Sequence, residues 1–207
     1  PAPPPDWFLL DRYLAAAELT GFRSVIVFNK VDLEMMPPEE LTDYGTLADS
    51  VCSTSTKAGS GLIDLAACMS GERSALIGQS GVGKSSLINV LLGDAKQSVS
   101  ELSEKSGHGQ HTTSTAVLYG LPSGGELIDS PGVRDYAPYI ADPRDVQRGF
   151  KEFGPVSGDC RFDDCRHLAE PNCAVKAAVA TGTIAARRYE SFKSLLELTE
   201  SIQEKRR

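Results

Sequence analysis

The chain has 207 residues, of which 41% are hydrophobic and 24% are charged, and its formal net charge is −7. This composition is typical of a soluble globular protein, and the length suits one good-sized domain with a small appendage. No apolar run approaches the roughly 18–20 residues of a membrane span. The opening residues 1–5, Pro-Ala-Pro-Pro-Pro, have neither the basic flank nor the apolar stretch of a secretory signal. We therefore expect neither a membrane protein nor a secreted one.

Charge is distributed unevenly along the chain. Residues 1–145 carry ten basic and nineteen acidic side chains, whereas residues 146–207 carry eleven basic and nine acidic ones. The overall acidity argues against a protein that coats nucleic acid with its whole surface, but it leaves a local basic patch possible.

The expected elements alternate along residues 1–145. Apolar residues at helical spacing predict helices over 7–19, 62–69 and 85–92, and another helix is expected after Pro37 and Pro38. Short apolar or β-branched runs predict strands over 24–28, 49–52, 74–77, 116–119 and 126–128. This alternation indicates an α/β domain with a mostly parallel sheet. Residues 94–114 are polar, and we expect a long loop there.

Beyond residue 145 the sequence changes to loops rich in Cys and His, followed by a last helix expected over 184–204. We therefore predict one domain over residues 1–145 and a small helix-rich domain over 146–207. Cys52 and Cys68 stand apart from the other three cysteines and are expected to be small buried apolar residues. The odd number of cysteines and the lack of a secretory signal favour a reducing cytoplasm, where clustered thiols more often hold a metal.

A phosphate-binding sequence follows the strand expected over 74–77. Residues 78–85, Gly-Gln-Ser-Gly-Val-Gly-Lys-Ser, match the pattern G-x4-G-K-[ST]. The glycines let backbone N–H groups point at phosphate oxygens, and the next helix offers its N-terminus to the same anion. Lys84 is expected to reach the terminal phosphates, and Ser85 to ligate Mg²⁺. The expected nucleotide contacts in this segment are Gly78, Gln79, Ser80, Gly81, Val82, Gly83, Lys84, Ser85 and Ser86.

A second phosphate-side motif, Asp-Ser-Pro-Gly, covers residues 129–132 after the strand expected over 126–128. Asp129 can hold Mg²⁺ through water, and the N–H of Gly132 can contact the γ-phosphate. Taken alone, this short motif is better explained by a simple turn. Its position 45 residues after Lys84, at the end of a neighbouring strand, favours the phosphate site.

A candidate base site follows the strand expected over 24–28, where residues 29–32 are Asn-Lys-Val-Asp. Asn29 can pair with the carbonyl and N7 of guanine, and Asp32 can accept hydrogen bonds from its N1–H and exocyclic amine. Adenine has a donor in place of the carbonyl and lacks that amine, so the pair selects guanine. The alternative is a strand-end turn with an Asx cap. Residues 55–57 after the next strand are the expected companion loop (Ser55, Thr56 and Lys57), although alone they are an ordinary polar loop.

The order of these motifs is unusual. Most GTPases carry the phosphate loop first and N-K-x-D last, whereas here Asp32 precedes Gly78. The two halves are exchanged, as in a circular permutation, which proteins tolerate where the original termini lie close together and loops are exposed. The segment after Gly132 then leads toward the cysteine cluster, so a nucleotide-driven shift there can reach the C-terminal module directly.

The combination of motifs resembles one family. It consists of N-K-x-D, the phosphate loop, Gly-Gln-His-Thr-Thr at residues 109–113, Asp129 to Gly132, and Cys-x4-Cys-x-His-x5-Cys. The same combination is found in the ribosome small subunit-dependent GTPase A family, circularly permuted bacterial GTPases that act in late maturation of the small ribosomal subunit. The resemblance implies a cytoplasmic GTP hydrolase that is stimulated by that subunit and contacts its rRNA, and we expect a monomer. The family usually carries an oligonucleotide-binding β-barrel at the N-terminus, which is not visible before Asp6.

The residue after Gly132 is Val133, where Ras-like enzymes carry the Gln that positions water. Its side chain has no donor or acceptor, so intrinsic hydrolysis is expected to be slow. His111 is the candidate for orienting the water, because a neutral imidazole can accept a hydrogen bond, and the family resemblance also points to it. The alternative is a loop histidine that binds only solvent or rRNA phosphate. By resemblance to related G-x-T-T loops, Thr113 rather than Thr112 is expected to ligate Mg²⁺, beside Ser85 and Asp129.

Three cysteines and one histidine cluster near the C-terminus, at Cys160, Cys165, His167 and Cys173. Three thiolates and one imidazole suffice for a closed tetrahedral Zn²⁺ site, and the family resemblance also implies zinc. A full ligand set leaves no position for water, so the ion would be structural. It would cross-link and stabilise a segment that is too short to build a hydrophobic core of its own. Six basic residues surround the cluster, and they suit either an rRNA-facing surface or a solvated mixed-charge face. They are Arg161, Arg166, Lys176, Arg187, Arg188 and Lys193.

Two other functions stay open from the residues alone. One is a nucleotide-gated rRNA-binding module with negligible turnover of its own. The other is a P-loop kinase or ATPase, which Asn29 and Asp32 disfavour because they suit guanine.

Overall fold

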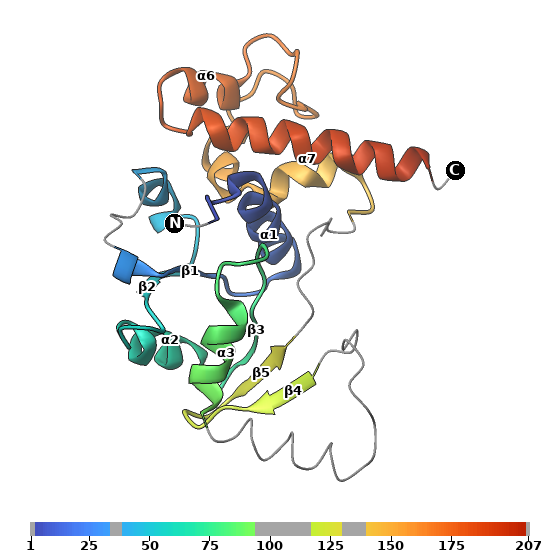
Figure 1. Ribbon diagram of the computed structural model, residues 1–207. Coiled ribbons are helices and arrows are strands. Elements are labelled where there is room, and N and C mark those ends of the chain that lie inside the picture. Colours follow the sequence, from blue (N-terminus) through green and yellow to red (C-terminus); the bar gives the residue numbers. More distant parts are fainter. Residues whose placement is uncertain (1–2, 34–38, 94–116, 130–139, 206–207) are drawn as a thin grey trace. The chain divides into compact units, whose positions relative to one another are not determined.

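The computed structural model describes residues 3–33, 39–93, 117–129 and 140–205 (Figure 1). The chain divides into two compact units. The strand unit comprises Pro1–Pro5, Val25–Pro38 and Ser50–Asp135, and the helical unit comprises Asp6–Ser24, Glu39–Asp49 and Tyr136–Arg207. This division differs from the boundary expected at residue 145, because residues 6–24 and 39–49 pack with the C-terminal helices.

The strand unit begins with a parallel pair of strands, β1 (Val25–Asn29) and β2 (Ser50–Thr54). Their register places Asn29 opposite Thr54, so the two strands end at the same edge. A short 3-10 turn, Val31–Leu33, follows β1 directly. Polar residues that come after these strands are therefore brought together by the pairing alone.

A second sheet in the strand unit has the order β3-β5-β4. The strands are β3 (Arg73–Ala75), β4 (Val117–Gly120) and β5 (Glu126–Asp129). β3 pairs with β5 in parallel, whereas β4 and β5 are antiparallel because a tight turn over residues 121–125 reverses the chain. The mostly parallel sheet expected from the sequence is thus present as two parallel pairs with an antiparallel hairpin added.

Two helices of the strand unit, α2 (Leu62–Met69) and α3 (Lys84–Leu92), share an apolar core with the strands. Leu65 and Met69 of α2, Leu87 and Ile88 of α3, and Leu127 of β5 are all buried in it. Burying such side chains stabilises the unit by roughly 1.5–3 kcal/mol for each one. The core therefore fixes the start of α3, where the phosphate loop ends.

The helical unit contains three longer helices and several short turns. The helices are α1 (Trp7–Thr20), α6 (Ala174–Ala180) and α7 (Ala186–Glu204), and the short elements are the 3-10 turns Glu39–Gly45, Pro143–Gly149 and Lys151–Phe153 and the single-turn α5 (Gly154–Ser157). α1 starts at Asp6, whose carboxylate accepts from the N–H of Leu9 at 2.9 Å, and ends at Gly21 with φ 71°.

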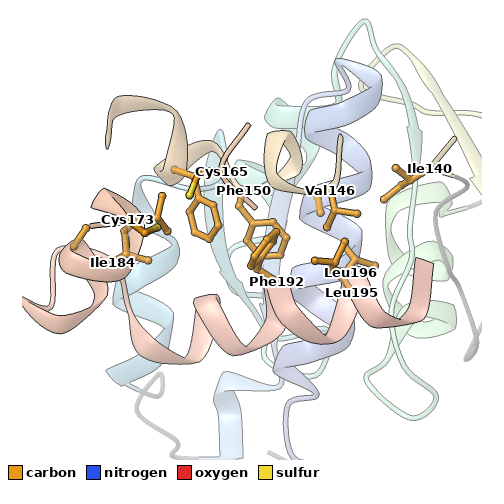
Figure 2. Packing of buried hydrophobic residues seen from close by; sticks show 13 residues of the cluster. Ile140, Val146, Phe150, Cys165, Cys173, Ile184, Phe192, Leu195 and Leu196 are labelled. Atoms are coloured by element: carbon orange, nitrogen blue, oxygen red, sulfur yellow. The ribbon is translucent and has the colours of Figure 1, made fainter. Parts of the chain in front are cut away.

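Aromatic rings form the centre of the helical unit. Phe192 of α7 meets Phe150 and Phe153 with ring centroids 5.6 and 5.1 Å apart, both edge to face. Figure 2 shows Phe150 and Phe192 turned toward one another above α7, with Leu195 and Leu196 farther along the same helix. The apolar face of α7 thus organises the unit.

A charged network is also buried in the helical unit. Arg188 of α7 donates to Asp11 of α1 at 2.7 Å and to Glu152 at 2.7 Å, and its side chain is 3% exposed. Arg187 donates to the other oxygen of Asp11 at 3.1 Å and to the hydroxyl of Tyr44 at 2.7 Å. Burial, together with the charge of Asp11, raises the pKa of Tyr44 above its usual range. The network joins α1, the turn at 39–45 and α7 by charge-assisted hydrogen bonds.

Most elements agree with the sequence expectations, with three differences. The helix expected after Pro38 is a 3-10 turn, β3 ends at Ala75 instead of 77, and the segment expected as Cys/His-rich loops also contains α6. The loop expected over 94–114 lies outside the described residues. Within the described ranges, no helix has both the length and the apolar character needed to cross a membrane.

Candidate nucleotide site and metal centre

The candidate base motif lies where β1 ends. Lys30 has φ 67°, which is uncommon for a residue with a side chain, so the chain turns sharply directly after β1. The amide nitrogen of Asn29 donates to the carbonyl of Val82 at 3.0 Å, and the ammonium of Lys30 donates to the carbonyl of Gly81 at 2.6 Å. The base motif and the phosphate loop are therefore tied together directly, although more than fifty residues separate them in the sequence.

Thr54 completes this link, although its residue type and position in the sequence do not point to such a role. Its hydroxyl, fully buried, donates to the amide oxygen of Asn29 at 3.1 Å, so the amide nitrogen must face Val82. The signal available in the sequence was a hydroxyl residue at the end of β2 immediately before Ser55. Only the register that pairs Thr54 with Asn29 shows what it does.

Asp32 is held by the companion loop. The hydroxyl of Ser55 donates to its carboxylate at 2.6 Å and in turn accepts from the N–H of Ala58 at 3.0 Å. This hydrogen bond from Ser55 is the main reason why the pKa of Asp32 lies below its usual value, and the charge of Lys57 acts in the same direction. Thr56 lies between these two residues in the same loop. The expected base-binding residues are thus gathered at one edge, with the Asp32 carboxylate oriented.

The phosphate loop connects β3 to α3. Lys84 donates to the carbonyls of Gly78 at 2.7 Å and Gln79 at 2.8 Å, and partial burial lowers its pKa. Gly83 has φ 99°, and a side chain there would collide with the amide of Asn29. The loop thus needs glycine where the base motif approaches it. Ser80, Ser85 and Ser86 are exposed around the start of α3, where backbone N–H groups favour an anion.

The remaining predicted phosphate-side residues are only partly described. Asp129 is the last residue of β5, and β5 pairs in parallel with β3, the strand that leads into the phosphate loop. The backbone of Asp129 therefore lies at the edge where the sequence analysis placed it. Gly132, Val133, His111, Thr112 and Thr113 lie outside the described residues.

The cysteine cluster is assembled in the helical unit. The ligand atoms of Cys160, Cys165, His167 and Cys173 all lie within 4.8 Å of one another. The Nδ1 atom of His167 is 3.6 Å from the sulfur of Cys160 and 3.3 Å from that of Cys173. Tetrahedral zinc, with Zn–S of about 2.3 Å and Zn–N of about 2.0 Å, separates its ligands by roughly 3.4–3.8 Å. The donor set and its spacing fit a zinc ion.

The residues around the cluster affect how readily its side chains can bind a metal. His167 is 1% exposed, and burial lowers its pKa, which favours the neutral imidazole that binds metals. Its Nε2 atom is buried, has no hydrogen-bond partner within the described part of the chain, and belongs to a ring packed edge to face on Phe153. Tyr189 donates to the carbonyl of His167 at 2.6 Å. Burial also raises the pKa of Cys165 to about 12, so a bound cation would be needed to keep this thiol ionised at neutral pH.

The basic residues around the cluster are mostly engaged within the unit. Arg187 and Arg188 belong to the buried network, and Lys176 donates to the carbonyls of Leu168 and Glu170, both at 3.0 Å. Arg166 pairs with Glu200, and Lys193 with Glu190. Arg161 lies over the ring of Phe162. These contacts favour the mixed-charge alternative over a basic surface formed by all six residues.

Comparison with known proteins identifies the family. A family model described as RsgA GTPase matches residues 2–138, about two thirds of the chain. The chain belongs to the RsgA GTPase family. It is 47% identical over 201 residues to the small ribosomal subunit biogenesis GTPase RsgA of Chromohalobacter salexigens, covering 95% of this chain and 58% of that protein. For the protein of the same name from Pseudomonas fluorescens Pf-5, the identity is 45%, with 95% and 59% covered. The chain thus spans a little over half the length of these RsgA relatives.

Two solved structures of similar fold agree with this membership. One is YjeQ from Thermotoga maritima, with a TM-score of 0.73 and 32% identity over 95% of this chain and 67% of that one. The other is YloQ, described as a circularly permuted GTPase, with a TM-score of 0.72 and 27% identity over 96% of this chain and 64% of that one. The chain has the α/β fold of a circularly permuted GTPase, as the order of its motifs predicts.

Proposed function

We propose that this chain binds guanine nucleotide and hydrolyses GTP, as part of a protein that acts in biogenesis of the small ribosomal subunit. The observation that carries the proposal is the chain of hydrogen bonds from Thr54 to Asn29 and from Asn29 to Val82. These hydrogen bonds hold the proposed base-binding loop (residues 29–32) and the phosphate loop (residues 78–85) in a fixed position relative to one another. The ribosomal role rests on the RsgA relatives, which are named small ribosomal subunit biogenesis GTPases.

Base selection is assigned to Asp32 and Asn29. Ser55 orients the Asp32 carboxylate and lowers its pKa, and the ionised group accepts from both N–H groups on the Watson–Crick edge of guanine. Adenine has neither the N1–H nor the 2-amino group of guanine, so it offers this carboxylate no donor at these two positions. A buried acceptor left without its donor costs affinity, which is the physical basis of the discrimination.

The phosphates are assigned to the loop over residues 78–86. Lys84 gives up its bonds to two backbone carbonyls and turns to phosphate oxygens, while the N–H groups at the start of α3 hold the same anion. Ser85, Thr113 and Asp129 are the proposed residues for Mg²⁺, with Asp129 acting through water. When bound, this ion neutralises charge on the β- and γ-phosphates. The N–H of Gly132 is assigned to the γ-phosphate.

Hydrolysis needs a group that orients water, and Val133 has none. We assign this role to His111, whose neutral imidazole accepts a hydrogen bond from the attacking water. The zinc centre is assigned a structural role, because its four protein ligands leave no position for a substrate. We further propose a cytoplasmic monomer whose partner is the small subunit and its rRNA.

The test is GTP turnover of this chain, measured with and without small ribosomal subunits. We expect subunits to stimulate turnover and His111→Ala to lower the stimulated rate at least about 100-fold. His108→Ala, in the same loop, is the matched control and is expected to change little. If the chain binds GTP but subunits do not stimulate its turnover, the nucleotide-gated rRNA-binding module is favoured. If His111→Ala and His108→Ala turn over GTP at equal rates, His111 has no role in catalysis.

A further inference from the structure

The strand unit brings together two cysteines that the nucleotide and zinc sites do not use. Cys52 of β2 and Cys68 of α2 have their sulfur atoms 4.0 Å apart, and neither is in a disulfide. The hydroxyl of Ser50 lies 4.0 Å from the sulfur of Cys52 and 3.9 Å from that of Cys68. A disulfide requires about 2.05 Å between its sulfur atoms, so the two sulfurs must approach one another by about 2 Å for the bond to form.

The two thiols differ in their access to solvent. Cys52 is 7% exposed, whereas Cys68 is half-buried. Burial raises the pKa of Cys52, with the neighbouring Cys68 acting in the same direction. An oxidant from solvent therefore meets Cys68 first, and Cys52 is placed to react with the oxidised sulfur.

We propose that Cys52 and Cys68 are an oxidation site that forms a reversible intramolecular disulfide with peroxides. The Cys68 thiolate attacks one oxygen of the peroxide, the O–O bond breaks, and hydroxide leaves with a sulfenic acid formed on Cys68. The deprotonated sulfur of Cys52 then attacks this sulfur, the S–O bond breaks, and a second hydroxide leaves. The two protons that the thiols gave up convert both hydroxides to water. In sum, two thiols and one hydrogen peroxide give one disulfide and two waters, and the peroxide takes the two electrons that the sulfurs lose.

The position of the pair connects it to the base site. Cys52 and Thr54 are two residues apart in β2, so their side chains lie on the same, buried face of the strand. Gly61, just before α2, lies so close to β2 that a side chain there would collide with the carbonyl of Ser53, so a shift of α2 is felt at the end of β2. Drawing Cys52 toward α2 therefore displaces Thr54, whose hydroxyl holds Asn29. This consequence rests on the proposed guanine site, whereas formation of the disulfide does not.

The first experiment treats the zinc-loaded chain with hydrogen peroxide, blocks remaining thiols with N-ethylmaleimide, and analyses the peptides by mass spectrometry. We expect a peptide pair linked through Cys52 and Cys68 that dithiothreitol releases. In Cys52→Ser, dimedone is expected to trap the sulfenic acid on Cys68, whereas in Cys68→Ser the Cys52 thiol is expected to stay unmodified. The proposal is overturned if both thiols stay alkylatable while added glutathione is fully oxidised, or if they link only to zinc-site cysteines or between chains.

The second experiment measures GDP affinity before oxidation, after it and after reduction. We expect oxidation to weaken GDP binding roughly fivefold, the size of one lost hydrogen bond, with recovery on reduction and no change in Cys68→Ser. If the reduced chain binds no guanine nucleotide, the proposed function fails and the disulfide is judged by mass alone. If the reduced chain binds GDP and the linked chain binds it equally well, the connection to the base site is wrong.

Discussion

The two units use polar side chains differently. At the candidate site of the strand unit, hydrogen bonds join loops that are partly exposed. In the helical unit, a network of charged side chains is buried among the helices. Neutral or singly charged hydrogen bonds made by Asn29, Lys30 and Asp32 link the base motif to the phosphate loop and to Ser55, and hold these segments in place for a ligand. Arg188 and Asp11, by contrast, are nearly or fully buried and bind one another within the core. The same kinds of bond therefore serve binding in one unit and stability in the other.

This difference has a measurable consequence. Removing a contact at the strand edge should lower nucleotide affinity and leave the free energy of unfolding nearly unchanged. Removing a contact from the core of the helical unit should lower that free energy and act on the nucleotide site only through loss of folding. Variants in both units, measured for both quantities, test this separation.

The largest effect is expected at the proposed zinc centre. Cys173→Ser removes one of four ligands from a buried cluster. Structural zinc in small domains is worth about 10–16 kcal/mol, which is comparable to the whole stability of a domain at about 5–15 kcal/mol. We expect the variant to bind less than one zinc ion per chain and to lose the near-UV circular dichroism of the helical unit. Cys68→Ser is the control and should keep both.

The next effect is expected in the buried network. Arg188→Met leaves Asp11 and Glu152 without their main partner inside the core, and such a loss typically costs about 3–5 kcal/mol. Urea unfolding measures this change. Lys193→Met on the same helix removes a solvent-exposed pair with Glu190 and a contact with the ring of Tyr189, and should cost at most about 1 kcal/mol. Equal losses for the two variants would contradict a stabilising role for the buried network.

A smaller effect is expected at Thr54. Thr54→Val keeps the shape of the side chain but removes the hydroxyl that orients the amide of Asn29. We expect GDP affinity to fall about five- to tenfold, because one hydrogen bond is worth about 1 kcal/mol or slightly more. Calorimetric titration measures the affinity. Thr20→Val is the control, since that hydroxyl bonds only to its own helix, and its affinity should be that of the parent chain.

The smallest effect concerns the titration of Asp32. Its pKa is lowered chiefly by the hydrogen bond from Ser55, so the ionised, base-binding form persists as the pH falls through the usual aspartate range. Ser55→Ala should move this pKa upward, and the acid limit of nucleotide binding should move to higher pH with it. Carboxyl-carbon NMR of Asp32 follows the change. An unaltered titration in Ser55→Ala would mean that other groups set this pKa.

Sequence reasoning went furthest where a motif carries its own chemistry. The residues of the phosphate loop, the base motif and the Cys/His cluster could each be proposed as a site because their types and spacing suit a phosphate, a base or a metal, and the structure brings the members of the cluster together. The site contact of Thr54 could not, since it depends on the register between β1 and β2. The same holds for Arg187 and Arg188, whose basic side chains suggested a surface but bind Asp11 in the core.

The assignment of residues to the two units could not be predicted from the sequence either. Residues 6–24 and 39–49 flank β1, the first strand of the strand unit, so their order along the chain suggests that they belong to that unit. The apolar residues of α1 instead pack with those that follow residue 136, as Ala15 does beside Val146 and Phe150. A helical pattern shows that a face is buried but does not tell which partner covers it.

The central claim, that the strand unit is a guanine site with Asp32 as its selector, is tested most directly by exchanging the base. Asp32→Asn replaces the carboxylate by an amide whose nitrogen can donate to the second carbonyl of xanthine. Binding of GDP, XDP and ADP is measured by calorimetry for the parent chain, for Asp32→Asn and for the matched exposed variant Asp64→Asn. We expect GDP to be preferred by the parent chain and by Asp64→Asn, and XDP to be preferred by Asp32→Asn. Unchanged preference for GDP in Asp32→Asn, or equal binding of ADP and GDP by the parent chain, would contradict the assignment.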